Sequence, residues 1–227
     1  MQSEKDIKRF KYMTKRRSIA TIIDVLEVRD KAGNFTLSSL QSILEILRRT
    51  QNISCVTLQF SFTPSLRLPM DDQVFQNLTS LNVNIPHAAL TRSLINHPAI
   101  TDLVLGVCGS PTCPLINSTL HSLRNLTCPP GCVQGLISAG TYLTRLVSFH
   151  GSPEDASFLM TRLLDFQVIP TFSVLTVLDI DFHHTTTRLL QRISAAAPAV
   201  AVLRLTESHF IVEVCHSVCD TDDHLIK

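Results

Sequence analysis

The sequence predicts an α/β solenoid, in which parallel strands form one long sheet and helices cover one side of it. The first observation is a short pattern, apolar-x-x-apolar-x-apolar, that occurs eight times along the chain. The second is a helix-type stripe of apolar residues that precedes several of these copies. The third is a proline placed shortly before a copy, where it ends a helix, at Pro98, Pro170 and Pro198. Together they predict a repeated helix, turn and strand.

Successive copies begin 20 to 32 residues apart, close to the period of roughly 20–29 residues that is typical of leucine-rich repeats. One such unit cannot bury both its strand and its helix, so neighbouring units stack and share a core. We therefore expect a leucine-rich-repeat solenoid, a curved horseshoe of about eight irregular repeats with strands on the concave face and helices on the convex face. The copies are Ile23-Leu26-Val28, Ile53-Val56-Leu58, Leu78-Leu81-Val83, Ile100-Leu103-Leu105, Leu123-Leu126-Cys128, Leu143-Leu146-Ser148, Leu175-Leu178-Ile180 and Val200-Leu203-Leu205.

The second repeat shows how each unit is built. Leucines recur at steps of three and four over residues 37–47, which predicts an amphipathic helix. Thr36 suits the N-cap, and Arg48 and Arg49 suit the C-terminus, where the helix dipole favours cations. Residues 53–60 then alternate as a strand does. The same order predicts helices over 89–96, 132–140, 152–166 and 187–197, and surface loops over 61–76 and 106–120.

We expect one elongated unit with a basic N-terminal segment or cap over 1–20, the repeat domain over 21–208, and a tail or cap over 209–227. The net charge is +1, which does not favour nucleic acid as the partner of the whole chain. Residues 1–17 are nevertheless rich in Lys and Arg, and a solvated, partly disordered segment is the simplest explanation of this charge.

The longest apolar run, 195–203, is interrupted by Pro198 and is too short to span a membrane. With no secretory signal, we expect an intracellular protein, cytoplasmic or nuclear, with reduced thiols.

Two groups of residues have the ligand types of a zinc site. One group is Cys108, Cys113, Cys128 and Cys132, and the other is His209, Cys215, Cys219 and His224. Neither spacing matches a common zinc motif. The repeat register also places Cys128 in the core, where a thiol often acts as a small hydrophobic side chain. We therefore expect no bound metal and no other cofactor.

The chain contains no catalytic signature, neither a Gly-rich phosphate loop, nor His-Glu-x-x-His, nor Gly-x-Ser-x-Gly. We therefore expect a non-catalytic protein whose concave face binds another protein. Arg145 and Phe149 are the expected anchors, because Arg and aromatic residues dominate protein interfaces. The expected contact residues are Gln59, Asn82, Asn84, Asp102, Asn125, Arg145, Phe149, Asp179, Asp181 and Arg204.

Two stretches carry a resemblance to a known family, Phe75-Gln-Asn-Leu-Thr-Ser-Leu-Asn-Val-Asn-Ile-Pro-His-Ala-Ala-Leu and His97-Pro-Ala-Ile-Thr-Asp-Leu-Val-Leu-Gly-Val-Cys. Over residues 20–210 the chain resembles the leucine-rich-repeat region of F-box proteins that are numerous in mushroom-forming fungi. The resemblance implies the substrate-recognition part of an F-box-like ubiquitin-ligase receptor, with a cullin-ligase adaptor as a candidate partner. The F-box itself, a helical segment that usually opens with Leu-Pro-x-Glu, is not evident. The alternative is a leucine-rich-repeat scaffold or regulator unrelated to ubiquitin.

Overall fold

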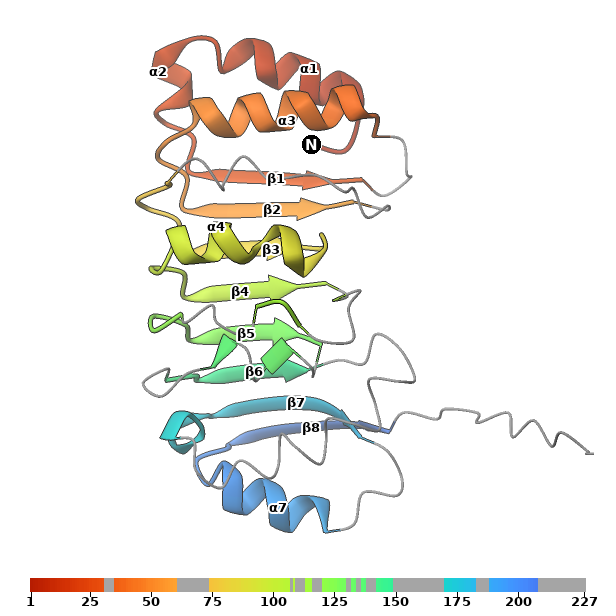
Figure 1. The fold of residues 1–227 in the computed structure, drawn as a ribbon, viewed down its shortest axis with the longest axis vertical. Helices are drawn as coiled ribbons and strands as arrows, with labels where there is room; N and C mark the ends of the chain where they lie inside the picture. The colour runs from red at the N-terminus through yellow and green to blue at the C-terminus, as the bar shows by residue number, and fades with distance from the viewer. Residues whose placement is uncertain are drawn as a thin grey trace, which may run out of the picture.

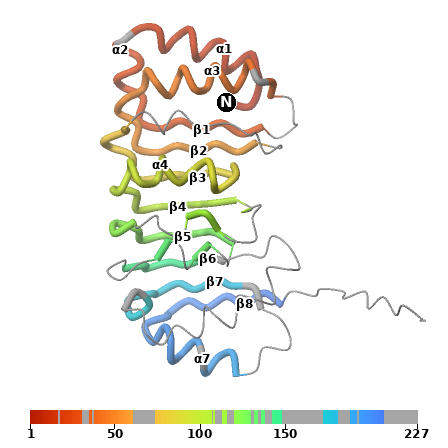
Figure 2. The backbone as a smooth tube through the Cα atoms, in the orientation of Figure 1, coloured from red at the N-terminus to blue at the C-terminus, as the bar shows by residue number. Residues whose placement is uncertain are grey.

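The computed structural model describes residues 1–30, 35–60, 74–106, 108, 113–115, 120–129, 132–133, 136–137, 142–148, 170–182 and 188–207. Within these residues, eight strands form one sheet in the order β1-β2-β3-β4-β5-β6-β7-β8, and every neighbouring pair is parallel (Figure 1). The backbone therefore advances from one end of the sheet to the other, strand by strand (Figure 2). The predicted α/β class and the predicted parallel sheet are confirmed.

The strands are short and evenly matched in length, as the repeated pattern predicts. They are β1 (Val25–Arg29), β2 (Cys55–Gln59), β3 (Ser80–Val83), β4 (Asp102–Leu105), β5 (Asn125–Cys128), β6 (Arg145–Ser148), β7 (Val177–Phe182) and β8 (Val202–Glu207). The described helices are α1 (Glu4–Met13), α2 (Arg17–Ala20), α3 (Leu37–Arg49), the 3-10 turn η2 (His87–Ala89), α4 (Thr91–Asn96), the 3-10 turn η3 (Pro170–Val174) and α7 (Leu189–Ala196).

Alternation along each strand separates the two faces of the sheet. In β1, Leu26 and Val28 are buried while Glu27 between them is exposed. The register aligns Leu26 with a buried row that crosses the sheet as far as β7, Val56, Leu81, Leu103, Leu126, Leu146 and Leu178, while the last residue in register, Leu203 of β8, is exposed. The buried residues of α3, α4 and α7 belong to the same core, so the helices cover this side of the sheet, and α4 lies across β3 in Figure 1.

Several expected helices are found where the sequence places them. Thr36 caps α3, because its hydroxyl accepts a hydrogen bond from the Ser39 amide at 3.3 Å. The helix expected over 89–96 begins as η2 and continues as α4, and the helix expected over 187–197 is α7. The expected helix 152–166, the loop 61–73 and the tail 209–227 lie outside the described residues, as do parts of 106–120 and 132–140. Among the described residues, no helix is long and apolar enough to cross a membrane.

The basic N-terminal segment is a folded helix, which corrects the expectation of a solvated, partly disordered end. Ser3 caps α1 by accepting a hydrogen bond from the Asp6 amide at 3.2 Å, and Ile7 of the same helix is fully buried. Lys11 Nζ lies 2.9 Å from Glu45 Oε1 and so joins α1 to α3. Counting charges alone does not reveal the apolar residues Ile7 and Phe10, which attach this helix to the core.

Residue 1 also covers the free edge of the sheet. The Met1 nitrogen donates a hydrogen bond to the Glu27 carbonyl at 2.6 Å, and the Arg29 amide donates to the Met1 carbonyl at 3.1 Å. Both bonds use backbone groups that a strand at the edge of a sheet leaves unpaired. Met1 therefore pairs with backbone groups at the outer edge of β1.

Ile7→Ala is expected to destabilise the protein by about 2–4 kcal/mol, because it removes a fully buried side chain that anchors α1. Lys8→Ala is the matched control, since the Lys8 side chain is 66% exposed and forms a surface ion pair with Glu4 one turn away. Urea unfolding followed by circular dichroism measures both variants. Equal midpoints for Ile7→Ala and the wild type would show that α1 is not part of the cooperative unit.

Candidate partner-binding surface

The outward residues of the strands line up in three rows, because the strands pair in register and side chains alternate between faces. We call this surface the open face. Its first row is Val25, Cys55, Ser80, Asp102, Asn125, Arg145, Val177 and Val202. Its second row is Glu27, Thr57, Asn82, Val104, Thr127, Val147, Asp179 and Arg204. The third row, at the carboxyl ends, contains Arg29, Gln59, Asn84, Gly106, Asp181 and Thr206.

Hydrogen bonds between neighbouring strands hold several of the expected contact residues in place. Gln59 Nε2 donates to Asn82 Oδ1 at 3.0 Å. Asp102 accepts from Thr101 Oγ1 at 2.6 Å and also from the Asn125 side-chain amide. Four of the expected residues therefore form two fixed pairs. These side chains are already ordered before a partner binds. The loss of side-chain conformational entropy on binding is therefore smaller.

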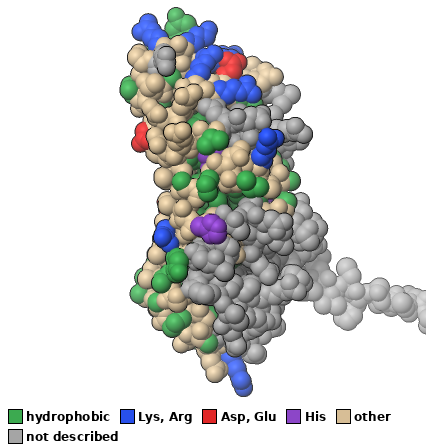
Figure 3. Space-filling view, turned by 60° about the vertical axis from the view of Figure 1, so that its left-hand side comes forward, with side chains coloured by type: hydrophobic (Ala, Val, Ile, Leu, Met, Phe, Trp, Pro, Cys, Tyr) green, Lys and Arg blue, Asp and Glu red, His purple; other side chains and the backbone are tan. Residues whose placement is uncertain are grey.

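Charges of opposite sign balance one another on the described part of the open face. Glu27 pairs with Arg29, and Asp179 Oδ2 lies 3.6 Å from Arg204 Nη1. The excess of Lys and Arg gathers instead at the end of the molecule formed by α1, α2 and α3 (Figure 3).

Arg145 is the sixth of the eight residues in the first row, between Asn125 on β5 and Val177 on β7. Its side chain is exposed, and among the described residues no carboxylate forms an ion pair with it. The guanidinium therefore remains able to form bidentate hydrogen bonds with a carboxylate of a partner. The other expected anchor, Phe149, lies outside the described residues, and for Asp181 only the backbone position in β7 is described.

Asn84 has a structural role that the sequence analysis did not predict. Its Oδ1 accepts a hydrogen bond from the Phe60 amide at 2.7 Å, and its side-chain amide donates to the Phe60 carbonyl. One side chain thus satisfies both backbone groups of the residue that follows β2. A Cβ atom on the neighbouring Gly106 would lie 2.8 Å from Asn84 Cα, so only glycine fits beside it. Asn84 therefore joins two repeats and is not free to bind a partner through its amide.

Asn84→Ala is expected to lower the free energy of unfolding by about 1–3 kcal/mol, because two backbone groups of Phe60 lose their partner. Asn82→Ala is the control on the same strand and should cost less than about 1 kcal/mol, since it removes one side-chain bond, to Gln59. Denaturant unfolding of the two variants side by side measures the difference. An equal loss in both would contradict the structural role of Asn84.

The structure changes the membership of the first cysteine group that the sequence suggested as a zinc site. Cys108, Cys113 and Cys132 come together, and the fourth member of their group is His87 rather than Cys128. Cys128 is fully buried in the core, as the register predicted, and burial raises its pKa, so it remains a neutral thiol. A hydrogen bond from the Cys132 thiol lowers the pKa of Cys113 despite its partial burial. The second group, His209 to His224, lies outside the described residues.

His87 was missed because it stands in a different repeat from the cysteines. Val83 at the end of β3 is paired in register with Leu105 at the end of β4. His87 lies four residues after Val83, and Cys108 lies three residues after Leu105. Cys132 follows Cys128, the corresponding residue of the next strand, by four residues. His87, Cys108 and Cys132 thus lie three or four residues after the ends of neighbouring strands. This shared distance from the strand ends is the sequence signal that connects them, and the spacing between the cysteines does not show it.

Comparison of the chain with protein-family models, with characterised proteins and with solved structures finds no match.

Proposed function

We propose that this protein is a leucine-rich-repeat solenoid whose open face binds a partner protein and performs no catalysis. The observation that carries the proposal is the in-register open face, where polar side chains are held in fixed pairs and opposite charges are balanced. The regular pattern of strand, turn and helix, repeated at 20 to 32 residues, supports the solenoid class. Such arrays commonly present one extended surface to another macromolecule.

Arg145 is the residue on which we expect recognition to depend most. It is exposed in the first row, beside the fixed pair of Asp102 and Asn125. A partner that places a carboxylate against Arg145 and hydrogen-bonding groups against Asn125 would satisfy both. Arginine is among the residue types that most often contribute a large share of the free energy of binding at protein interfaces.

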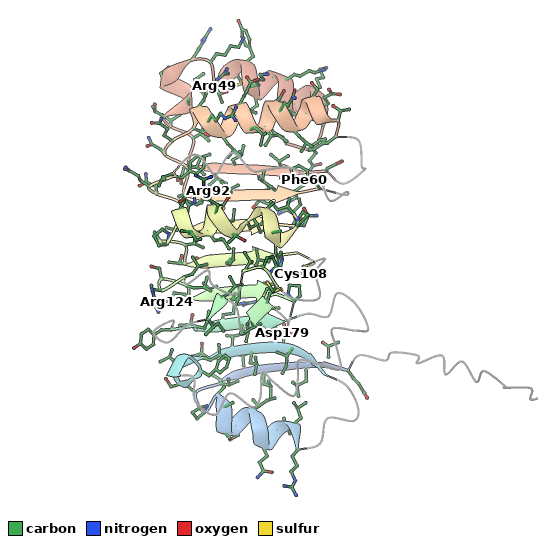
Figure 4. The ribbon with its side chains drawn as sticks, viewed as in Figure 1. Arg49, Phe60, Arg92, Cys108, Arg124 and Asp179 are labelled. Atoms are coloured by element: carbon green, nitrogen blue, oxygen red, sulfur yellow. The ribbon has the colours of Figure 1, made fainter. Side chains whose placement is uncertain are left out.

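The test compares three forms of the tagged full chain in affinity capture from native cell extract, read by mass spectrometry. They are the wild type, Arg145→Glu on the open face, and Arg92→Glu on the exposed side of α4, which is the matched control (Figure 4). Proteins retained by the wild type and by Arg92→Glu but lost by Arg145→Glu, and then shown to bind directly when purified, would support the proposal. Identical sets of captured proteins in all three forms would contradict it.

The resemblance to F-box proteins supports a narrower form of this proposal, the target-recognition part of a ubiquitin-ligase receptor. Recovery of a cullin-ligase adaptor together with an Arg145-dependent partner would support the narrower form. Recovery of Arg145-dependent partners without the adaptor would favour a scaffold or regulator unrelated to ubiquitin.

A further inference from the structure

Four potential metal ligands converge where three successive strands end. The ligand atoms of His87, Cys108, Cys113 and Cys132 all lie within 4.8 Å of one another. His87 follows β3, Cys108 follows β4 and Cys132 follows β5, so the group links three neighbouring repeats. Cys108 is labelled beside the carboxyl end of β4 in Figure 4. The residue types are three thiols and one imidazole, which is one of the standard ligand sets of structural zinc.

The hydrogen bonds of His87 direct one ring nitrogen toward the sulfurs. Its Nε2 lies 3.1 Å from the Gly106 carbonyl oxygen, which can only accept, so Nε2 carries the proton. In the neutral ring, Nδ1 therefore has a free lone pair. That Nδ1 lies 3.3 Å from Cys132 Sγ and 3.5 Å from Cys113 Sγ. A histidine that ligates a metal commonly donates its other N–H to a backbone carbonyl, and His87 has this arrangement already.

The distances match those of a zinc tetrahedron. With bonds of about 2.3 Å to sulfur and about 2.1 Å to nitrogen, tetrahedral angles place nitrogen and sulfur about 3.6 Å apart. The two nitrogen–sulfur separations at His87 are 3.3 Å and 3.5 Å. A single ion at the centre of the group would therefore reach all four ligands after small side-chain adjustments. His87 and Cys132 are buried, while Cys108 and Cys113 are partly exposed, so an ion can enter from the solvent.

Two other buried residues show what a purely structural role looks like in this chain. His97 uses both ring nitrogens within the fold, because Nδ1 donates to the Ser93 carbonyl at 2.6 Å and Nε2 accepts from the Phe75 amide at 2.9 Å. Cys128 is surrounded by the core and is not a member of the converging group. His87 differs from His97 in that its second nitrogen faces sulfur atoms instead of a backbone group.

We propose that His87, Cys108, Cys113 and Cys132 bind one Zn²⁺ ion and that the ion fastens the ends of β3, β4 and β5 to one another. The site is structural, since four protein ligands leave no open position for a substrate. It does not depend on the proposed function of the open face, because the ligands lie beyond the carboxyl ends of the strands. Binding also requires reduced thiols, and zinc displaces their protons.

The test uses the purified full chain, reduced and freed of metal, titrated with Co²⁺ as a spectroscopic substitute for zinc. We expect one equivalent of Co²⁺ to produce thiolate-to-metal charge-transfer absorption together with the intense visible bands of tetrahedral cobalt. Addition of Zn²⁺ should abolish both sets of bands at one equivalent. This measurement needs no variant, so a misfolded mutant cannot affect it.

Single variants then identify the ligands. Cys113→Ser and Cys132→Ser should each weaken Zn²⁺ binding at least 100-fold in competition with a chromophoric chelator, and His87→Gln at least 10-fold. The matched controls are Cys55→Ser, which alters a thiol on the open face, and Cys128→Ala, which alters a thiol in the core. Both controls should bind Zn²⁺ as the wild type does.

Two results would overturn the proposal. One is the absence of charge-transfer bands in the reduced wild-type chain at one equivalent of Co²⁺. The other is an equal loss of Zn²⁺ affinity in Cys55→Ser and Cys113→Ser, which would show non-specific binding to thiols. Tetrahedral bands that disappear in Cys113→Ser but persist in Cys55→Ser would establish the site.

Discussion

Removal of zinc by a chelator is expected to lower the melting temperature of the full chain by about 10 °C. A ligand present at about 1,000 times its dissociation constant stabilises the folded state by about 4 kcal/mol. For a chain of 227 residues, each kcal/mol corresponds to about 2–4 °C. The effect should be large because the ligands join three repeats whose contacts otherwise depend on short strands. Differential scanning calorimetry with and without chelator measures the shift.

The control for this prediction is the double variant Cys113→Ser, Cys132→Ser. It should melt at the temperature of the chelated wild type, and the chelator should leave its melting temperature unchanged. A wild-type chain that carries one equivalent of zinc and melts at the same temperature after chelation would show that the ion contributes nothing to stability.

Leu103→Ala is expected to lower the free energy of unfolding by about 3 kcal/mol, which corresponds to a fall of about 6–12 °C in melting temperature. Leu103 lies in β4, near the middle of the sheet, and is fully buried between the neighbouring leucines Leu81 and Leu126. Truncation removes apolar contact and leaves a cavity that the strands on either side cannot fill by moving.

Val104→Ala is the matched control for Leu103→Ala, because the next residue of the same strand faces the open side and is only half-buried. Its expected cost is about 1 kcal/mol or less. Denaturant unfolding curves of both variants provide the comparison. If Val104→Ala cost as much as Leu103→Ala, the assignment of the two faces of the sheet would be wrong.

The architecture could be predicted from the sequence because it depends on periodicity. A residue pattern that recurs at nearly constant spacing places equivalent residues on neighbouring strands, so Leu81, Leu103 and Leu126 had to align. Alternation within each strand then determined which residues face the core. The burial of Cys128 followed from the same register, and it was predicted correctly.

The N-terminal helix shows the limit of reading charge alone. Its Lys and Arg residues suggested a solvated segment, yet Ile7 and the Lys11–Glu45 pair attach the helix to α3. One buried apolar residue changes the average composition of a polar helix very little. Its effect depends on a partner surface that the sequence does not show.

The repeated apolar pattern thus determined the strand order, the register and the two faces of the sheet, since each of these follows from the period of the chain. The roles of individual polar residues depended on the tertiary structure. Asn84 bonds to Phe60 in the preceding repeat, and His87 meets Cys132 from two repeats further along. The residues in these two contacts are about 20 to 50 positions apart in sequence. They meet because the stacking of neighbouring strands brings the ends of those strands close together. No spacing along the chain encodes such a meeting; the packing of the repeats creates it.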